Sequence, residues 1–284
     1  MLGVLFDGIA YGSLLFLVSL GLSVTMGLMN FVNLAHGAFA MGGGYVCVVA
    51  MTRFGVPFLA ALPLAFVATA AIGAILERLL YRRLYTASHL DQVLFSIGLT
   101  FMSIAAATYF FGSSQQPVRL PDFLRGQVRF AGADLGIYRL FLIAAVAALT
   151  TVLALLVTRT RFGAQVRASV DDAQAARGLG IDVDRVFSYA FALGSGLAGL
   201  GGALGIEVLG LDASFPLKFM VYFLLVVVVG GAGTLKGPLV AALLLGVLDV
   251  AGKYYVPQVG AFVIYAAMVV LLIVFPAGLF GRRR

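Results

Sequence analysis

Residues 8–29 read GIAYGSLLFLVSLGLSVTMGLM and contain no charged side chain. As an α-helix, which rises about 1.5 Å per residue, this run is long enough to cross the roughly 30 Å hydrocarbon core of a bilayer. No basic residue precedes it, and the apolar run continues at full length, which is not the pattern of a cleavable signal peptide. We therefore expect residues 8–29 to form a membrane-spanning helix.

The composition of the whole chain agrees with this expectation. The 284 residues are 62% hydrophobic and 11% charged, and the mean hydropathy is +1.07. A soluble domain has about 25% charged residues and cannot hide so much apolar surface from water. The predicted fold is an all-α integral membrane protein that forms a single transmembrane domain over 1–284. Further candidate spans are 34–52, 57–76, 93–111, 140–157, 186–206, 219–229, 239–251 and 261–275.

Two stretches interrupt this pattern and predict broken or re-entrant helices. The segment 30–37 is polar between two spans, and the glycine-rich segment 230–238 separates two short spans. Irregular backbone is tolerated at membrane depth only where protein or water covers it. We expect a polytopic helix bundle of 8–10 spans.

The basic residues indicate the orientation. The net charge is +7, and the loops after the third and fifth spans are rich in arginine. By the positive-inside rule these loops are cytoplasmic, with the N-terminus periplasmic and the C-terminus cytoplasmic. The predicted cytoplasmic side has 12 of the 19 basic residues: Arg78, Arg82, Arg83, Arg159, Arg161, Arg167, Arg177, Arg185, Lys236, Arg282, Arg283 and Arg284. The outward loop 112–139 contains turn residues, and Tyr138 and Arg139 are placed to anchor the next helix at the membrane interface.

The cytoplasmic stretch 159–185 reads RTRFGAQVRASVDDAQAARGLGIDVDR and is too polar to cross lipid. Its good helix formers over 164–177 predict an exposed amphipathic helix, ended by two glycines. A small-residue face flanked by charges suits docking into a groove on a partner, while a solvated helix that caps the bundle is the plainer alternative. The candidate docking residues are Asp171, Asp172, Ala173, Ala176, Arg177, Gly178 and Gly180.

Polar side chains in the first break are the candidates for a solute path. Asn30, Asn33 and Gly37 follow helical spacing, and His36 is one position away. Amides and an imidazole among apolar neighbours are costly unless they face the bundle interior or water. They either line a solute path or join helices by hydrogen bonds. The glycines of 230–238 either coordinate a solute or make a tight turn.

Several chemistries lack their residues. With one cysteine and two histidines, of which His89 lies far from His36, no zinc site is expected. The acids Asp7, Glu207 and Asp249 lie near predicted span ends, so no midplane coupling acid is evident. No catalytic cluster and no GxxxxGK[ST] motif occur, so we expect no cofactor in this chain and any ATP to be bound by another polypeptide.

Short motifs then occur in one order along the chain. They are NLAHG at 33–37, ERLLYR at 77–82, SIGL at 96–99, the polar loop at 161–185, the glycines of 230–237 and PAGLFG at 276–281. Together they resemble the LivH-type permeases of branched-chain amino acid ABC transporters over essentially the whole length. Leu34 stands where that family usually has phenylalanine, and the Glu-Ala-Ala spelling of the docking loop is absent.

The resemblance implies a permease subunit in the bacterial inner membrane that is not itself an enzyme. The implied partners are a second, LivM-like permease, two cytoplasmic ATPase subunits and a periplasmic amino-acid-binding protein. Its substrate would be leucine, isoleucine, valine or a similar small amino acid. An importer of urea, short amides or aromatic acids, a secondary transporter or channel, and a membrane enzyme are the alternatives.

Overall fold

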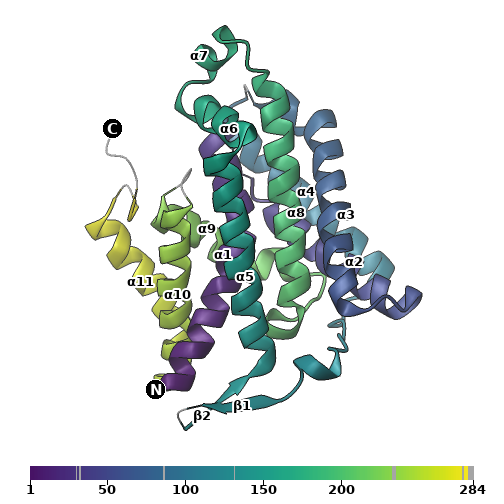
Figure 1. The fold of residues 1–284 in the computed structure, drawn as a ribbon, viewed down its shortest axis with the longest axis vertical. Helices are drawn as coiled ribbons and strands as arrows, with labels where there is room; N and C mark the ends of the chain where they lie inside the picture. The colour runs from purple at the N-terminus through teal and green to yellow at the C-terminus, as the bar shows by residue number, and fades with distance from the viewer. Residues whose placement is uncertain are drawn as a thin grey trace.

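Helices make up nearly all of the regular structure (Figure 1). The computed structural model describes residues 1–29, 31, 33–85, 87–130, 132–231, 235–276 and 278–280. Its α-helices are α1 (Leu2–Met29), α2 (His36–Phe54), α3 (Phe58–Leu79), α4 (His89–Phe111), α5 (Ile137–Arg159), α6 (Arg161–Asp171), α7 (Ala173–Gly178), α8 (Val183–Leu209), α9 (Phe215–Gly230), α10 (Lys236–Tyr255) and α11 (Gly260–Val274). Two 3-10 turns, η1 (Tyr81–Leu84) and η2 (Asp122–Leu124), and two strands, β1 (Gln127–Phe130) and β2 (Ala133–Gly136), complete it.

Every span expected from the sequence corresponds to a helix. Within the described residues, seven helices, α1 to α5, α8 and α10, are long and apolar enough to cross a membrane, and α9 and α11 are shorter apolar helices. The prediction of a polytopic helix bundle is therefore confirmed. The expected short span 239–251 is wrong in its bounds, because α10 has 20 residues. It extends past Asp249 to Lys253, whose ammonium lies 2.6 Å from the Asp249 carboxylate one helical turn away.

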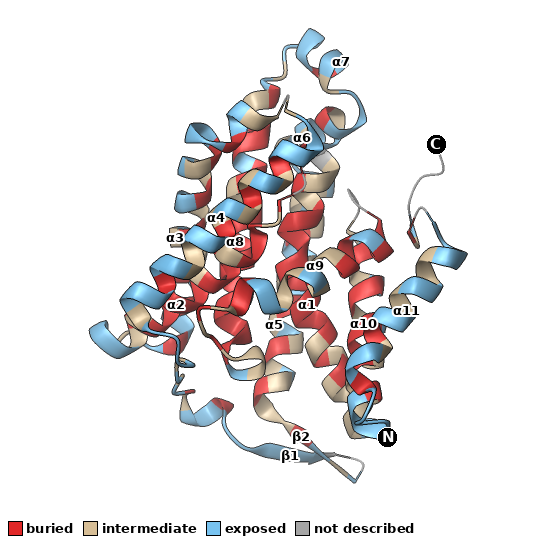
Figure 2. Cartoon of the chain, turned by 180° about the vertical axis from the view of Figure 1, so that it is seen from behind, coloured by how far each residue is buried: buried red, intermediate tan, exposed pale blue. Residues whose placement is uncertain are grey.

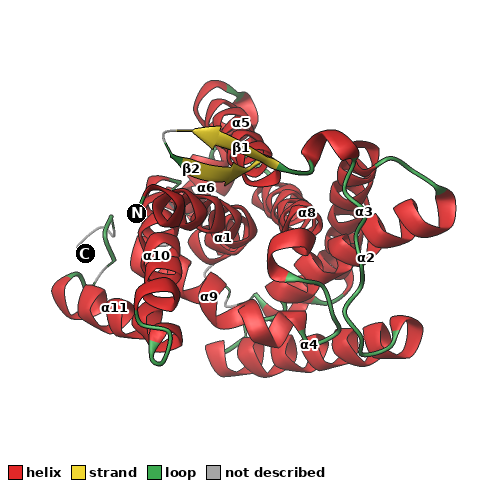
Figure 3. Cartoon of the chain, turned by 90° about the horizontal axis from the view of Figure 1, so that it is seen from below, coloured by secondary structure: helices red, strands yellow, loops and turns green. Residues whose placement is uncertain are grey.

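α1 and α8 form the centre of the bundle and are mostly buried (Figure 2). Viewed along the bundle, α3, α4, α5 and α11 lie around them (Figure 3). Glycines allow this close approach, since a β-carbon at Gly43 or at Gly202 would clash with the backbone of Gly199 or Ala40, respectively. A β-carbon at Gly12 would lie 2.8 Å from the α-carbon of Leu243, so α1 and α10 also meet backbone to backbone. Small residues thus let α8 pack closely against its neighbours.

The outer helices turn large apolar side chains away from the bundle. α3, α4 and α11 each carry six of them, and fewer than a third of the residues in the apolar windows of α3 and α4 are buried. Apolar surface of this extent fits contact with lipid acyl chains. Examples are Ile75, Met102, Phe110, Phe262 and Ile273.

The two ends of the bundle differ (Figure 1). α6 and α7 extend from one end, and the start of α1 and the β1–β2 hairpin lie at the other. The arginines of the η1 turn, of α6 and of α7 gather at the first end, as the charge pattern predicts. The basic residues 282–284, which also entered that prediction, lie outside the described residues.

The outward loop contains an antiparallel hairpin that the sequence did not predict. Gln127 pairs with Gly136 and Phe130 with Ala133. The predicted interface role of Tyr138 is wrong, because its side chain is buried and its hydroxyl donates to the Leu204 carbonyl at 2.6 Å. Arg139 forms an ion pair with Asp7, so both residues fasten α5 within the chain.

Both predicted breaks occur. α1 ends at Met29, and α2 begins at His36, whose ring touches the carbonyl of Val18 near the middle of α1. The chain therefore returns into the bundle between these helices. In the second break, a β-carbon at Gly230 would lie 2.6 Å from the Gly237 carbonyl carbon, which brings the two helix ends together. This contact fits the tight-turn interpretation; residues 232–234 lie outside the described residues.

Candidate functional site

The first break is held by a buried hydrogen-bond pair. The hydroxyl of Tyr81 donates to Asn33 Oδ1 at 3.1 Å, and the backbone N–H of Ala35 donates to the same oxygen at 3.1 Å. The Asn33 Nδ2 atom is buried and has no partner among the described residues. An unpaired buried amide costs about 1–3 kcal/mol, so this donor is open to a partner that enters the break.

His36 joins the first turn of α2 to α1. Its Nε2 atom lies 2.7 Å from the Val18 carbonyl oxygen, and because a carbonyl only accepts, Nε2 carries the proton. Gly21 makes room for the ring, since a β-carbon there would lie 2.7 Å from the His36 Cε1 atom. In this conformation His36 links two helices, and its role in a solute path stays a prediction. Asn30, the other candidate, lies outside the described residues.

Glu77 is a buried acid that the sequence reasoning placed in a loop. It lies in the last turn of α3 with 0% of its surface exposed. The Tyr85 hydroxyl donates to Oε1 at 2.7 Å, and the Ser188 hydroxyl donates to Oε2 at 2.5 Å. These bonds tie α3, the segment after η1 and α8 together. Glu77 and Tyr81 both belong to the ERLLYR motif at 77–82, which did not by itself indicate their burial.

Asp249 is the second buried acid that the sequence placed near a span end. Only 1% of it is exposed, and its Oδ1 atom has no partner among the described residues. Lys253 supplies the ion pair on the other oxygen and also lies 5.8 Å from the ring centre of Tyr11. The sequence did not indicate that Asp249 is buried, and the expectation that no coupling acid lies at the midplane stays a prediction. Asp249 lies in the second half of α10.

The polar stretch 159–185 forms two helices with a corner between them, not one continuous helix. Thr160 caps α6, because its hydroxyl accepts from the Gly163 N–H at 3.1 Å. Asp172 breaks the helix, and its Oδ1 accepts from the N–H groups of Gln174 and Ala175 at 2.9 Å each. Asp172 is thus an N-cap, and the run of helix formers hid it. Gly180, with φ of +82°, takes the left-handed conformation after α7, as expected.

Ala173 and Ala176, which were predicted to form an outward docking face, do not both point away from the bundle. Ala176 is only 2% exposed and Ala173 is half-buried, so their shared face packs within the chain. Arg177 is exposed and pairs with Asp184 at 3.1 Å. The outermost apolar side chain is Leu179, which is 82% exposed and was not among the candidates. The remaining candidates, Asp171, Asp172, Gly178 and Gly180, are exposed along the same unit.

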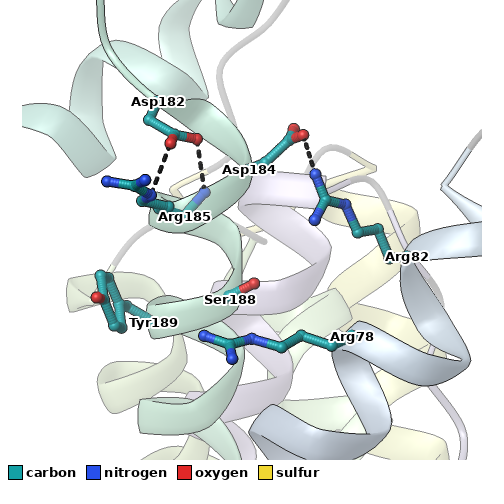
Figure 4. A pocket seen from close by; sticks show the side chains of 7 residues that line it. All are labelled: Arg78, Arg82, Asp182, Asp184, Arg185, Ser188 and Tyr189. Carbon is teal, nitrogen blue, oxygen red and sulfur yellow. Dashed lines mark hydrogen bonds and ion pairs between the residues drawn. The ribbon is translucent and has the colours of Figure 1, made fainter.

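Ion pairs connect this unit to the bundle. Figure 4 shows the pair of Arg82 with Asp184 and the contacts of Asp182 with Arg185. Asp184, in the first turn of α8, receives Arg177 from α7 and Arg82 from η1. Asp182 caps α8 by accepting from the Arg185 N–H at 3.1 Å, and the Arg185 guanidinium lies 2.8 Å from the same side chain. Asp184 thus connects α7 and η1 to the first turn of α8.

An apolar cavity of about 810 Å³ lies between α2, α3 and α4. It begins at Ala38, two residues after His36, and its walls are mainly aliphatic and aromatic. The Tyr45 hydroxyl at its wall is buried and unpartnered among the described residues. A cavity of this size and lining accommodates an apolar side chain with few polar contacts.

Apolar helices of spanning length, a break inside the bundle and a polar unit outside it define a polytopic membrane transport protein. No group of metal-ligating side chains occurs among the described residues. A family model described as branched-chain amino acid transport system / permease component matches residues 4–274, and the chain belongs to this family.

Curated relatives agree with the family match over nearly the full length. The high-affinity branched-chain amino acid transport system permease protein LivH of Escherichia coli is 28% identical, over 98% of this chain and 94% of the relative. BraD of Pseudomonas aeruginosa, with the same description, is 25% identical over 98% and 95%. A probable branched-chain amino acid transport permease protein LivH of Methanocaldococcus jannaschii is 27% identical over 95% and 87%. No solved structure matches the chain.

Proposed function

We propose that this chain is the permease subunit of an ATP-driven importer in the inner membrane, and that it carries leucine, isoleucine, valine or a similar small amino acid. The observation that carries the proposal is the exposed α6–α7 unit, fastened to the span α8 through Arg177 and Asp184. The family match and the names of the relatives support the solute class. The chain has no phosphate-binding loop of its own, so separate ATPase subunits supply the nucleotide site.

The α6–α7 unit is the proposed docking site for an ATPase. Leu179 at its tip supplies the apolar contact, and the charged residues Asp171, Asp172 and Arg177 surround it. An exposed apolar side chain with a polar rim is the usual composition of a protein contact. In this proposal the end that carries α6 and α7 is cytoplasmic, and the N-terminus is periplasmic.

Transmission of the ATPase movement follows from the packing of α8. When the ATPase dimer closes, α7 pulls Asp184 and hence the first turn of α8. α8 meets α1, α2 and α3 through glycines, so its displacement shifts the helices around the first break. Asn33 and His36 lie at that break, and their contacts with Tyr81 and Val18 change with it. Access to the solute path then alternates between the two sides of the membrane.

The solute path is proposed to run past the first break. The Asn33 Nδ2 donor, which has no partner in the described part of the chain, offers a hydrogen bond to the solute carboxylate, and the apolar cavity beside Ala38 accommodates an aliphatic side chain. Asn30 completes the proposed set. A periplasmic binding protein selects the solute, and a second, LivM-like permease forms the other half of the path.

Reconstitution tests this proposal. The chain, the second permease and the ATPases are co-purified and placed in proteoliposomes, with labelled leucine, isoleucine, valine, urea, a short amide and an aromatic acid as solutes. We expect ATP hydrolysis to rise with the loaded binding protein, and uptake of the branched amino acids to require ATP. Equal uptake without the ATPases would instead identify a channel or a secondary transporter, and preferred uptake of urea or an amide would change the solute class.

A further inference from the structure

A polar cavity of about 260 Å³ opens between α3, η1 and the start of α8 (Figure 4). Arg78 reaches into it from the end of α3, Arg82 from η1 and Arg185 from α8. Both spans end here, since α3 covers Phe58–Leu79 and α8 begins at Val183. α3, at 22 residues and about 1.5 Å per residue, matches the hydrocarbon thickness. The cavity is thus at the depth of the lipid headgroups.

The charges in this cavity do not balance. Asp184 is already held by Arg82 and Arg177, and Asp182 is held by Arg185. Arg78 has no carboxylate partner among the described residues, and in Figure 4 its guanidinium extends below Ser188 with no dashed line reaching it. The nearby acid Glu77 is turned away, because its two oxygens accept from Tyr85 and Ser188. One guanidinium therefore faces the cavity without an anion.

Apolar side chains continue from the cavity along the lipid-facing surface. Ile75, one turn before Arg78 on the same side of α3, is 56% exposed, and Leu79 is exposed beside it. Tyr189 lines the cavity from α8 and is 58% exposed. A cationic pocket at headgroup depth with an apolar track leading into the bilayer matches the two ends of a phospholipid, a charged head and an acyl chain.

We propose that this cavity binds the phosphate group of an anionic phospholipid, with Arg78 as the principal contact and the Ile75 surface holding an acyl chain. Guanidinium groups bind phosphate oxygens through paired N–H donors, and basic pockets between membrane helices suit anionic headgroups. The bound lipid would sit beside Asp184 and so brace the point where α7 joins α8. This proposal is independent of which solute is carried.

The test titrates phosphatidylglycerol into the purified permease complex in detergent and follows its melting temperature, with phosphatidylcholine and inorganic phosphate as parallel arms. Arg78→Gln removes the cation that has no carboxylate partner among the described residues, and Arg83→Gln is the matched control, an exposed arginine of η1 that does not line the cavity. We expect the apparent dissociation constant for phosphatidylglycerol to rise about fivefold in R78Q, and to change less than twofold in R83Q. Ile75→Ser should weaken lipid binding and leave the phosphate arm unchanged.

Three results would overturn the proposal. Equal phosphatidylglycerol affinity in R78Q and R83Q would remove Arg78 from the site. Inorganic phosphate could also raise the melting temperature as much as the lipid does, in a way that depends on Arg78 but not on Ile75. That result would identify the ligand of the cavity as a free anion. Loss of lipid binding whenever the ATPases are assembled would make the cavity a protein contact. If R78Q does not fold, two other variants still test the site. Arg78→Lys keeps the charge, and I75S changes the apolar surface next to the cavity.

Discussion

His36 Nε2 and the carbonyl oxygen of Val18 lie 2.7 Å apart, which fixes the first residue of α2 against the middle of α1. Losing a buried hydrogen bond of this kind costs about 0.5–1.5 kcal/mol. We predict that His36→Leu lowers the melting temperature of the purified permease and reduces uptake, and that His36→Gln, whose amide can donate to the same carbonyl, restores the melting temperature. If Gln restores stability but not uptake, the imidazole has a role at the solute. An H36L protein with unchanged stability and uptake would contradict the prediction.

Leu179 is the predicted centre of the ATPase contact. Replacing it with Asp puts a charge at the exposed tip of the α6–α7 unit and should reduce co-purification of the ATPases at least tenfold, while the permease still inserts. Val128→Asp is the control, because Val128 is also exposed but lies on the hairpin at the opposite end. Ala176→Glu should instead lower the folded yield, since Ala176 is buried. Normal ATPase recovery with L179D would exclude this docking surface.

Glu77 is predicted to be a structural acid. Glu77→Ala leaves the hydroxyls of Tyr85 and Ser188 without their acceptor, and we expect it to lower the stability by about 2–4 kcal/mol. Glu77→Gln keeps one acceptor and should lose less. Glu207→Ala serves for comparison, because Glu207 is exposed on α8. Thermal unfolding in detergent measures all three, and an E77A protein as stable as E207A would refute the role.

Gly43 is predicted to tolerate no β-carbon. A methyl group there would clash with the backbone of Gly199, so Gly43→Ala should destabilise the bundle by about 1–3 kcal/mol. Gly98→Ala is the matched control, since nothing lies within 4 Å of a β-carbon at Gly98, and it should be neutral or slightly stabilising. The yield of monodisperse protein and the melting temperature report both effects. Equal behaviour of the two variants would show that the α2–α8 contact is looser than described.

Asp212 gives a pH-dependent prediction. Burial raises the pKa of Asp212, but the hydrogen bonds from Lys218 and Ser214 outweigh this and hold the pKa below its usual value. A carboxylate with a lowered folded-state pKa stabilises the protein above its unfolded pKa of about 3.9, and this stabilisation is lost as the pH falls through the folded value. Asp212→Asn should therefore melt below the wild type at pH 7, with the difference vanishing as the pH drops below 4. A constant difference across that range would contradict the shift.

The helices were predictable because each span is a local property. Bilayer thickness sets a run length, and each of the nine runs became a helix. The direction in which a side chain points was not predictable, since it depends on distant partners. Buried Glu77 accepts a hydrogen bond from Ser188, which lies 111 residues further along the chain. Ala176 is buried although its helix is mostly exposed. The helix break at Asp172 was missed because its capping geometry competes with helix propensities that favour continuation.

The glycines along α8 have a mechanical consequence. Where two helices contact through interlocking side chains, those side chains must separate before one helix can slide along the other. Gly199 and Gly202 face the backbone of α2 and have no side chains, so no side chains interlock at these two positions. Under the proposed mechanism, α8 can therefore shift along α2 without any side chain at these two positions having to change its rotamer.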